Sequence, residues 1–389
     1  MTIDRVTTCT GCMMCLSSCP VNAISVKDDI LRGKVPWIDY SECIECDRCI
    51  RICPEVNDVV KEKTGKVYAA FNKKNDAYMR ASSGGVFACL AEYVISQGGI
   101  VVGAAWTNNK NVEHIIIDNL KDINLLQKSK YLQSSISKTI FLQIENALKS
   151  NRLVLFSGTP CQVAGMKRYK KKYEDKLVLL DIVCHGVIPG RVFETYIDYL
   201  ENRYNIDILS FDFRHKDRRM GQYLNKITYK KKNTMRLCEY IGTWNMSSYF
   251  YTFMMGYMYR ESCYQCKYST KERVGDITLG DFWGIKAIRP ELHRRHGLSL
   301  VIVNNELGNR VMTNIMKSIE VHEINDERAL ADNPQLSHPC TKPNDNEQLM
   351  QEYKKKGYKA IAEKYKRARS GRCKSKCILL VKKIYYFGK

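Results

Sequence analysis

Two runs of cysteine near the N-terminus have the residue type and spacing that can hold iron–sulfur clusters. Each run has three cysteines separated by two residues, then three residues, a fourth cysteine and a proline. The runs are Cys9, Cys12, Cys15 and Cys19, and Cys43, Cys46, Cys49 and Cys53. A 4Fe-4S cluster needs four thiolates converging on one small object, and three closely spaced cysteines can wrap one side of it. The pattern therefore predicts two clusters within residues 1–60.

The fourth cysteine of each run has a different role from the other three. In ferredoxins with two such runs, it crosses over and binds the cluster of the other run. We therefore assign Cys9, Cys12, Cys15 and Cys53 to one cluster, and Cys43, Cys46, Cys49 and Cys19 to the other. Gly11 lies inside the first run, where a residue without a side chain lets the backbone approach the cluster. Zinc is a poor alternative, because tetrahedral zinc sites use paired cysteine knuckles without a distant crossing partner.

Four more cysteines lie further along the chain. Cys161 and Cys184 each follow an apolar segment typical of a strand, and Cys263 and Cys266 form a C-x2-C pair ahead of a glycine-rich segment. Together they could supply the four ligands of a third 4Fe-4S cluster. The spacing alone leaves two alternatives open. In the first, the four cysteines are ordinary buried thiols; in the second, Cys263, Cys266 and His185 form a zinc site.

Several short motifs surround these cysteines in a fixed order. They are residues 80–87 (RASSGGVF), 129–131 (SKY), 157–162 (SGTPCQ), 181–186 (DIVCHG), 213–214 (FR), 263–266 (CYQC) and 276–284 (DITLGDFWG). From residue 1 to about 305 the chain resembles the family of the beta subunit of coenzyme F-420-reducing hydrogenases and dehydrogenases, whose relatives include 7-hydroxymethyl chlorophyll a reductase. The resemblance implies a ferredoxin domain that feeds a flavin domain holding FAD and a further 4Fe-4S cluster. The ligands it implies for that cluster are Cys161, Cys184, Cys263 and Cys266.

One candidate flavin site precedes a helical segment. Neither a Rossmann fingerprint nor a P-loop is present. Instead Ser82, Ser83, Gly84 and Gly85 stand before an apolar stretch with helical periodicity, so that backbone N–H groups and the helix N-terminus could approach a pyrophosphate or a flavin carbonyl. The simpler alternative is a helix N-cap with glycine flexibility.

The other candidate cofactor contacts come from three motifs. They are Ser129, Lys130, Tyr131, Gly158, Thr159 and Arg214. Lys130 could place a cation near the charge that develops on a reduced flavin, or be an ordinary solvated charge. Gly158 and Thr159 offer backbone contacts beside a cluster ligand, and Arg214 is a candidate for a substrate or phosphate contact. No catalytic residue is assigned.

The segment after Arg214 departs from the family. The family commonly continues to a Gly-Trp pair, whereas here Gly221 is followed by Gln222. Residues 214–219 are also unusually basic. The hydride donor or acceptor therefore stays open, and a deazaflavin is not assumed.

The periodicity predicts an α+β fold. We expect a two-cluster ferredoxin-like domain, then a larger mixed α/β domain for flavin and iron–sulfur, then a basic helical tail. Residues 87–95 have helical periodicity, and buried strands are expected at 100–106, 153–157, 177–183 and 298–303. We expect the ferredoxin domain at 1–60 and the basic tail at 346–389. The reductase domain lies between them in two parts, 61–150 and 151–345, and the third cluster is expected in the part at 151–345.

Composition favours a reducing compartment. Seventeen cysteines would indicate disulfides in a short secreted chain. The first residues, however, contain no apolar signal segment, and no apolar run approaches the ~20 residues that a membrane span needs. We therefore expect a cytoplasmic protein whose cysteines bind metal.

The net charge of +21 is concentrated at the C-terminus. Residues 354–389 alone supply +13 of it. No nucleic-acid-binding motif accompanies this charge, so nucleic acid is not an expected partner. We expect first a solvated helical tail, and second a tail that contacts an anionic membrane surface or an acidic partner protein.

Together these features predict an iron–sulfur flavoprotein oxidoreductase. It would relay electrons between a ferredoxin-type or deazaflavin-type carrier and an organic substrate, through the clusters and FAD, and act as an oligomer. The direction of flow is open, because cluster potentials span about −700 to +450 mV. Resemblance to proteins encoded among bacterial surface-polysaccharide genes implies a sugar-linked substrate as one variant. The alternative is a non-catalytic electron-transfer subunit that serves a partner enzyme.

Overall fold

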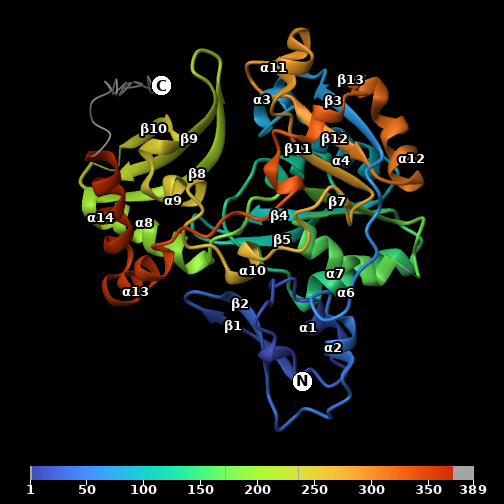
Figure 1. Ribbon diagram of the computed structural model, residues 1–389, viewed down its shortest axis with the longest axis horizontal. Helices are drawn as coiled ribbons and strands as arrows, with labels where there is room; N and C mark the ends of the chain where they lie inside the picture. Colours follow the sequence, from blue (N-terminus) through green and yellow to red (C-terminus); the bar gives the residue numbers. More distant parts are fainter. Residues whose placement is uncertain (1, 171, 235, 371–389) are drawn as a thin grey trace.

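The computed structural model describes residues 2–170, 172–234 and 236–370 (Figure 1). A small N-terminal domain lies below a large mixed sheet, and a second lobe with its own sheet lies beside them. The predicted fold class, a ferredoxin-like domain followed by a larger α/β domain, is confirmed. No helix in the described ranges combines the length and apolar character needed to cross a bilayer.

Short elements position the eight N-terminal cysteines. Helix α1 (Met14–Ser18) begins inside the first run and α2 (Arg48–Ile52) inside the second. Cys19 and Cys53 are their C-caps, and the proline after each cannot continue a helix. The two helices pack against each other. A hairpin of β1 (Ile24–Asp29) and β2 (Gly33–Ile38) completes the domain.

The body is an eight-stranded sheet with the order β13-β3-β12-β11-β7-β6-β4-β5. Its strands are β3 (Lys66–Asn72), β4 (Ile100–Trp106), β5 (Val112–Ile117), β6 (Val154–Gly158), β7 (Leu177–Ile182), β11 (Ile277–Asp281), β12 (Ser299–Val303) and β13 (Ile319–Glu323). The central strands β4, β6, β7 and β11 are parallel, and the outer pairs are antiparallel. The carboxyl ends of the parallel strands therefore share one edge, where open α/β sheets bind ligands.

Helices cover both faces of this sheet. One face carries α4 (Val86–Ser96), α5 (Ile123–Leu126) and α12 (Glu306–Ile315); the other carries α6 (Lys138–Lys149) and α7 (Pro160–Lys170). Neighbouring strand residues point to opposite faces, so Leu155 packs under α4 while Phe156 packs under α6 and α7. Burial on both faces explains why the central strands appear in the sequence as continuous apolar runs.

The second lobe lies between β7 and β11 in the sequence and is completed by C-terminal helices. Its antiparallel sheet contains β8 (Ile206–Asp217), β9 (Gly221–Lys231) and β10 (Leu237–Thr243), and its helices are α8 (Gly190–Tyr204), α9 (Ser248–Met254), α13 (Asn346–Lys356) and α14 (Tyr358–Ser370). The remaining short elements are α3 (Asn75–Arg80), α10 (Glu261–Tyr264), α11 (Ile285–Ile288), η1 (Ile3–Arg5), η2 (Leu120–Asp122), η3 (Trp244–Met246), η4 (Pro290–Leu292), η5 (Met316–Ser318), η6 (Glu327–Leu330) and η7 (Pro334–Leu336).

The large sheet takes β3–β5 from before residue 150 and its other five strands from after it, which is compatible with 61–150 and 151–345 as two parts of one domain. The structure differs from one expectation, because the C-terminal segment is not a solvated tail as far as residue 370. Tyr353, Tyr358 and Ile361 are buried in the aromatic core of the second lobe, while the lysines lie on the outer face. The rest of the expected tail, 371–389, lies outside the described residues.

Candidate functional site

The cysteines of the N-terminal domain are brought together across the two runs. Burial raises the pKa of Cys12, and the neighbouring Cys9 and Cys53 raise it further. Burial and Cys9 likewise raise the pKa of Cys53. Cys53 of the second run therefore lies beside the first run, as the predicted crossing requires. Burial raises the pKa of Cys49, and the neighbouring Cys46 and Cys43 raise it further. These three cysteines therefore lie together as the second group.

The four downstream cysteines also converge. Cys161 lies in the first turn of α7, Cys184 follows β7, and Cys263 lies in α10 with Cys266 just after it. Burial raises the pKa of Cys161 to about 12, that of Cys263 to about 11, and that of Cys184 well above its ordinary value; other members of the group raise each further. Burial therefore favours the protonated form of Cys161, Cys184 and Cys263 at neutral pH, and metal binding would release those protons.

The zinc alternative for this group gains no support. In the described ranges, no three His, Cys, Asp or Glu side chains are arranged around a single metal ion. Thiolates around a four-iron cluster lie farther apart than those around one ion, because the cluster occupies the space between them. His185 turns to Trp283, with 5.4 Å between ring centroids, and burial lowers its pKa.

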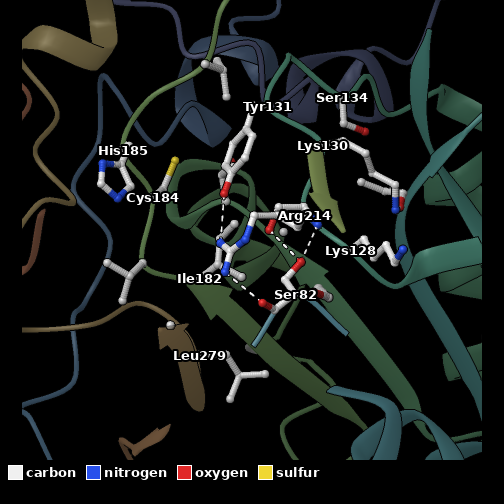
Figure 2. A pocket seen from close by; sticks show the side chains of 18 of the residues that line it. Ser82, Lys128, Lys130, Tyr131, Ser134, Ile182, Cys184, His185, Arg214 and Leu279 are labelled. Carbon is white, nitrogen blue, oxygen red and sulfur yellow. Dashed lines mark hydrogen bonds between the residues drawn. The ribbon is translucent and has the colours of Figure 1, made fainter. Parts of the chain in front are cut away.

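A cavity of about 410 Å³ opens at the carboxyl edge of the parallel strands (Figure 2). Nine of the ten predicted cofactor contacts line it: Ser82, Ser83, Gly85, Ser129, Lys130, Tyr131, Gly158, Thr159 and Arg214. Cys161 and Cys184 also line it, so the downstream cysteine group borders the cavity directly. The volume falls within the range typical of small-molecule sites.

Gly84 is the exception. Its N–H donates to Ser299 Oγ at 3.0 Å, and a Cβ at this position would lie 2.2 Å from the carbonyl oxygen of Ala70. Glycine is therefore required for the close packing of this loop on β3 and β12. The N-terminus of α4 does line the cavity, beginning with Gly85 as the N-cap.

Arg214 spans the cavity from the second lobe to the large sheet. Its guanidinium pairs with Asp281, at 2.9 Å and 3.0 Å to the two carboxylate oxygens. It also donates to Tyr131 Oη at 3.0 Å and to the Ser82 carbonyl at 2.8 Å (Figure 2). Burial opposes the charge, but Asp281 holds the pKa of Arg214 well above its ordinary value. The buried Nε has no hydrogen-bond partner, so one donor of this residue is left for a ligand.

Lys130 differs from the expectation of a cation directed at a flavin. Its ammonium donates to the carbonyls of Ala104 at 2.8 Å, Leu125 at 3.2 Å and Gln127 at 2.8 Å. An ammonium has three donors, and each has an acceptor here. Burial lowers the pKa of Lys130 to about 7. The residue therefore joins α5 to β4.

His114 and Gln162 hold the loop that follows β6. The His114 ring stacks on Phe156, with Nδ1 2.8 Å from Ser134 Oγ and Nε2 3.1 Å from the Ser157 carbonyl. Burial lowers the pKa of His114 to about 4, so the ring is neutral and its Nε2–H donates. Gln162 accepts from the Thr159 N–H at 3.1 Å. In the sequence Gln162 is visible only as part of a motif, and His114 was missed, because a single histidine in a strand carries no signal of such a role.

Two other buried side chains that sequence reasoning missed connect the N-terminal domain to the cavity wall. Gln133 accepts from the Lys34 N–H at 2.8 Å and donates to the Lys34 carbonyl at 3.1 Å. Arg260, 2% exposed, donates to the carbonyls of Cys9 at 2.8 Å and Lys34 at 3.1 Å. None of the ion pairs in the described part of the chain includes Arg260, and its Nε has no partner. A buried, unpaired guanidinium is costly, and an anionic thiolate cluster at Cys9 would compensate it. The donor set therefore fits a cluster at this position.

Comparisons with known proteins agree with this arrangement. Residues 151–327 match the family model for the C-terminal part of the coenzyme F-420 hydrogenase/dehydrogenase beta subunit, and residues 8–57 match the 4Fe-4S dicluster domain. The chain is 42% identical over 52 residues to Ferredoxin-3 of Chlorobaculum tepidum, which is 12% of this chain and 76% of that protein. The chain is also 35% identical over 48 residues to an uncharacterized protein from the rpl9-rpl11 intergenic region of Porphyra purpurea. This match covers 12% of the chain and 64% of that protein.

A solved structure aligns with most of the chain. It is a xenon-derivatized F-420-reducing NiFe hydrogenase complex from Methanosarcina barkeri. The alignment covers 80% of this chain and 93% of one chain of that complex, with 13% sequence identity and a TM-score of 0.46. The matches to the two family models, which cover the N-terminal cysteine runs and the segment from β6 to β13, decide the assignment. The chain is an iron–sulfur electron-transfer protein that belongs to the coenzyme F-420 hydrogenase/dehydrogenase beta subunit family.

Proposed function

We propose that this chain is a cytoplasmic iron–sulfur flavoprotein oxidoreductase. It relays electrons between a ferredoxin-type or deazaflavin-type carrier and an organic substrate, within an assembly of several subunits. The observation that carries the proposal is that Cys161 and Cys184 line the same cavity as nine predicted cofactor contacts. A third metal centre and an organic cofactor would then adjoin each other.

The cysteine groups follow one another closely enough for such a relay. Cys161 contributes to the raised pKa of Cys12, so the first ferredoxin group and the downstream group are neighbours. A Cβ at Gly165, one turn after Cys161, would lie 3.3 Å from Cys12 Sγ. Cys161, Cys184, Cys263 and Cys266 would hold a third 4Fe-4S cluster, beside the one at Cys9, Cys12, Cys15 and Cys53.

The cavity would hold FAD between the two lobes. The N-terminus of α4 favours an anionic group, and the unpartnered Nε of Arg214 supports a polar acceptor nearby. Clusters exchange single electrons and a bound flavin exchanges hydrides, which together link a one-electron carrier to an organic substrate. The Arg214–Asp281 pair fixes the distance between the lobes, and His114 orients the loop at Gly158.

Anaerobic purification followed by iron and flavin quantification tests the proposal. About twelve irons per chain and one FAD are expected, whereas about eight irons would exclude the third cluster. Cys161→Ser should remove about four irons and leave the ferredoxin signals in electron paramagnetic resonance intact. Cys89→Ser is the matched control, because Cys89 is a buried cysteine of α4 outside all three groups. Three clusters without flavin would instead indicate a non-catalytic electron-transfer subunit.

A further inference from the structure

A second cleft, of about 480 Å³, lies outside the cavity and the cysteine groups. It is formed by α3 and by the end of β8 with the turn that leads into β9. The residues that line it are Asn75, Asp76, Met79, Arg80, His215, Lys216, Asp217, Arg218 and Arg219. The basic segment noted in the sequence therefore forms one wall of a hollow on the protein surface.

One residue that lines the cleft is a buried cation. Lys216 is 5% exposed, and its ammonium lies 4.2 Å from the centre of the Tyr78 ring. It donates to the carbonyls of Tyr78, at 2.7 Å, and Ser83. None of the ion pairs in the described ranges includes it. Burial, and then Arg214, lower its pKa to about 7, against an opposing effect of Asp281.

The rim carries three exposed arginines. Arg80, Arg218 and Arg219 take part in no ion pair among the described residues. Two carboxylates, Asp76 and Asp217, also line the cleft, and Asp217 Oδ1 accepts from the backbone N–H groups of Arg219 and Met220, both at 2.8 Å. The two carboxylates offset only part of the charge of the three arginines and Lys216, so the cleft has a net positive charge.

The backbone of the rim is fixed although the guanidinium groups are exposed. Arg295 donates to the Arg219 carbonyl, and His296 Nε2 lies 3.1 Å from the Asp217 carbonyl. These contacts attach the turn after β8 to the loop before β12. A preorganised turn lowers the entropy that a ligand must overcome to bind.

We propose that this cleft binds the phosphate groups of a small phosphorylated ligand. Arginine forks match phosphate geometry with paired hydrogen bonds, and Lys216 adds positive charge to the lining of the cleft. A small anion can enter a hollow of this size, whereas a protein partner needs a broad surface.

The cleft adjoins the cavity through the chain itself. Arg80 lines the cleft and Ala81 lines the cavity; likewise His215 lines the cleft and Arg214 the cavity. The phosphate end of a ligand would therefore be held next to the residues that border the cavity. The site goes beyond the proposed relay, since phosphate binding requires neither clusters nor flavin.

Isothermal titration calorimetry of the full chain at constant ionic strength tests the proposal, with inorganic pyrophosphate as the probe. Arg218→Gln should weaken binding by about tenfold or more, because a hydrogen-bonded charge is lost. Arg5→Gln makes the same change of charge in η1, far along the chain from the cleft, and should bind like the wild type. Equal weakening in both variants, or no binding in the wild type, would overturn the proposal.

Two further measurements keep the result interpretable. Lys216→Met should abolish binding, and Arg80→Gln should weaken it from the opposite wall of the cleft without removing a buried group. Inorganic phosphate in a separate titration distinguishes a single phosphate subsite from a diphosphate subsite. Acetate serves as the control anion, and acetate binding as tight as that of pyrophosphate would refute a site built for phosphate.

Discussion

Gly11 provides the most direct test of how the N-terminal domain is attached. Its φ of 70° lies in the left-handed region, and an added Cβ would lie 2.4 Å from Gln133 Nε2 and 2.9 Å from Arg260 Nη1. These are the two side chains that bind the Lys34 backbone. Gly11→Ala should therefore displace Gln133 and loosen the contact between the N-terminal domain and the body.

The size of the effect follows from two contributions. The left-handed conformation costs an alanine about 1–2 kcal/mol. Loss of both Gln133 hydrogen bonds to Lys34 costs about 1–3 kcal/mol more, at about 0.5–1.5 kcal/mol each. The local opening free energy at Lys34 should fall by about 2–5 kcal/mol, which corresponds to amide exchange about 30-fold faster or more.

Hydrogen–deuterium exchange of a peptide that contains Lys34 measures this opening. Gly98→Ala is the matched control, because Gly98 has almost the same φ, 71°, and a Cβ there meets nothing within 4 Å. It carries the conformational cost alone and should leave exchange at Lys34 unchanged. If Gly11→Ala also leaves that exchange unchanged, the Gln133 and Arg260 contacts do not hold the domain, and the reasoning is refuted.

Three other predictions concern the body and the second lobe. Arg214→Gln leaves the Asp281 carboxylate without its partner and should lower the free energy of unfolding in urea by about 3–5 kcal/mol, whereas a change under 1 kcal/mol would mean that the pair does not join the lobes. Lys130 loses its proton near pH 7 in the folded state and near pH 10 when unfolded, so stability should rise with pH across that window by up to about 1.4 kcal/mol per unit; Lys130→Met should remove this rise in urea titrations. Ile361→Ala should cost about 2–5 kcal/mol, since a buried side chain is truncated, while a solvated tail would show no loss.

The cysteine pattern predicted the N-terminal domain well, because its chemistry depends on spacing along the chain. Three ligands of a cluster lie within one loop, and the proline after Cys19 or Cys53 ends the short helix that presents the crossing cysteine. Strands β4, β6, β7 and β12 were equally accessible, since burial on both faces leaves continuous apolar runs such as residues 177–182. In both cases the information is local.

The parts that were missed depend on contacts between distant segments. Lys130 has the sequence context of a surface lysine, but its ammonium reaches Ala104, which lies in β4. The C-terminal lysines conceal an apolar face at Tyr353 and Tyr358, which becomes apparent only when the aromatic core of the second lobe is assembled. Arg260 precedes a cysteine pair in the sequence, yet its hydrogen bonds are to Cys9 and Lys34. Periodicity and motif spacing contain no signal for such pairings.

The orientation of the N-terminal domain implies an order for electron transfer. The domain is bound at one end by Arg260, which donates to the Cys9 carbonyl, and at the other by Arg168, which donates to the Asn57 carbonyl at 2.7 Å. These contacts hold it against the body. Cys15 and Cys53 of the first group are buried, whereas α2 has no buried residue and Ile44, beside Cys43, is 60% exposed. The second cysteine group is therefore more accessible to a redox partner than the first. Because Cys161 neighbours the buried group, we propose that the path of the proposed relay runs from the exposed cluster through the buried one to the cavity, or the reverse.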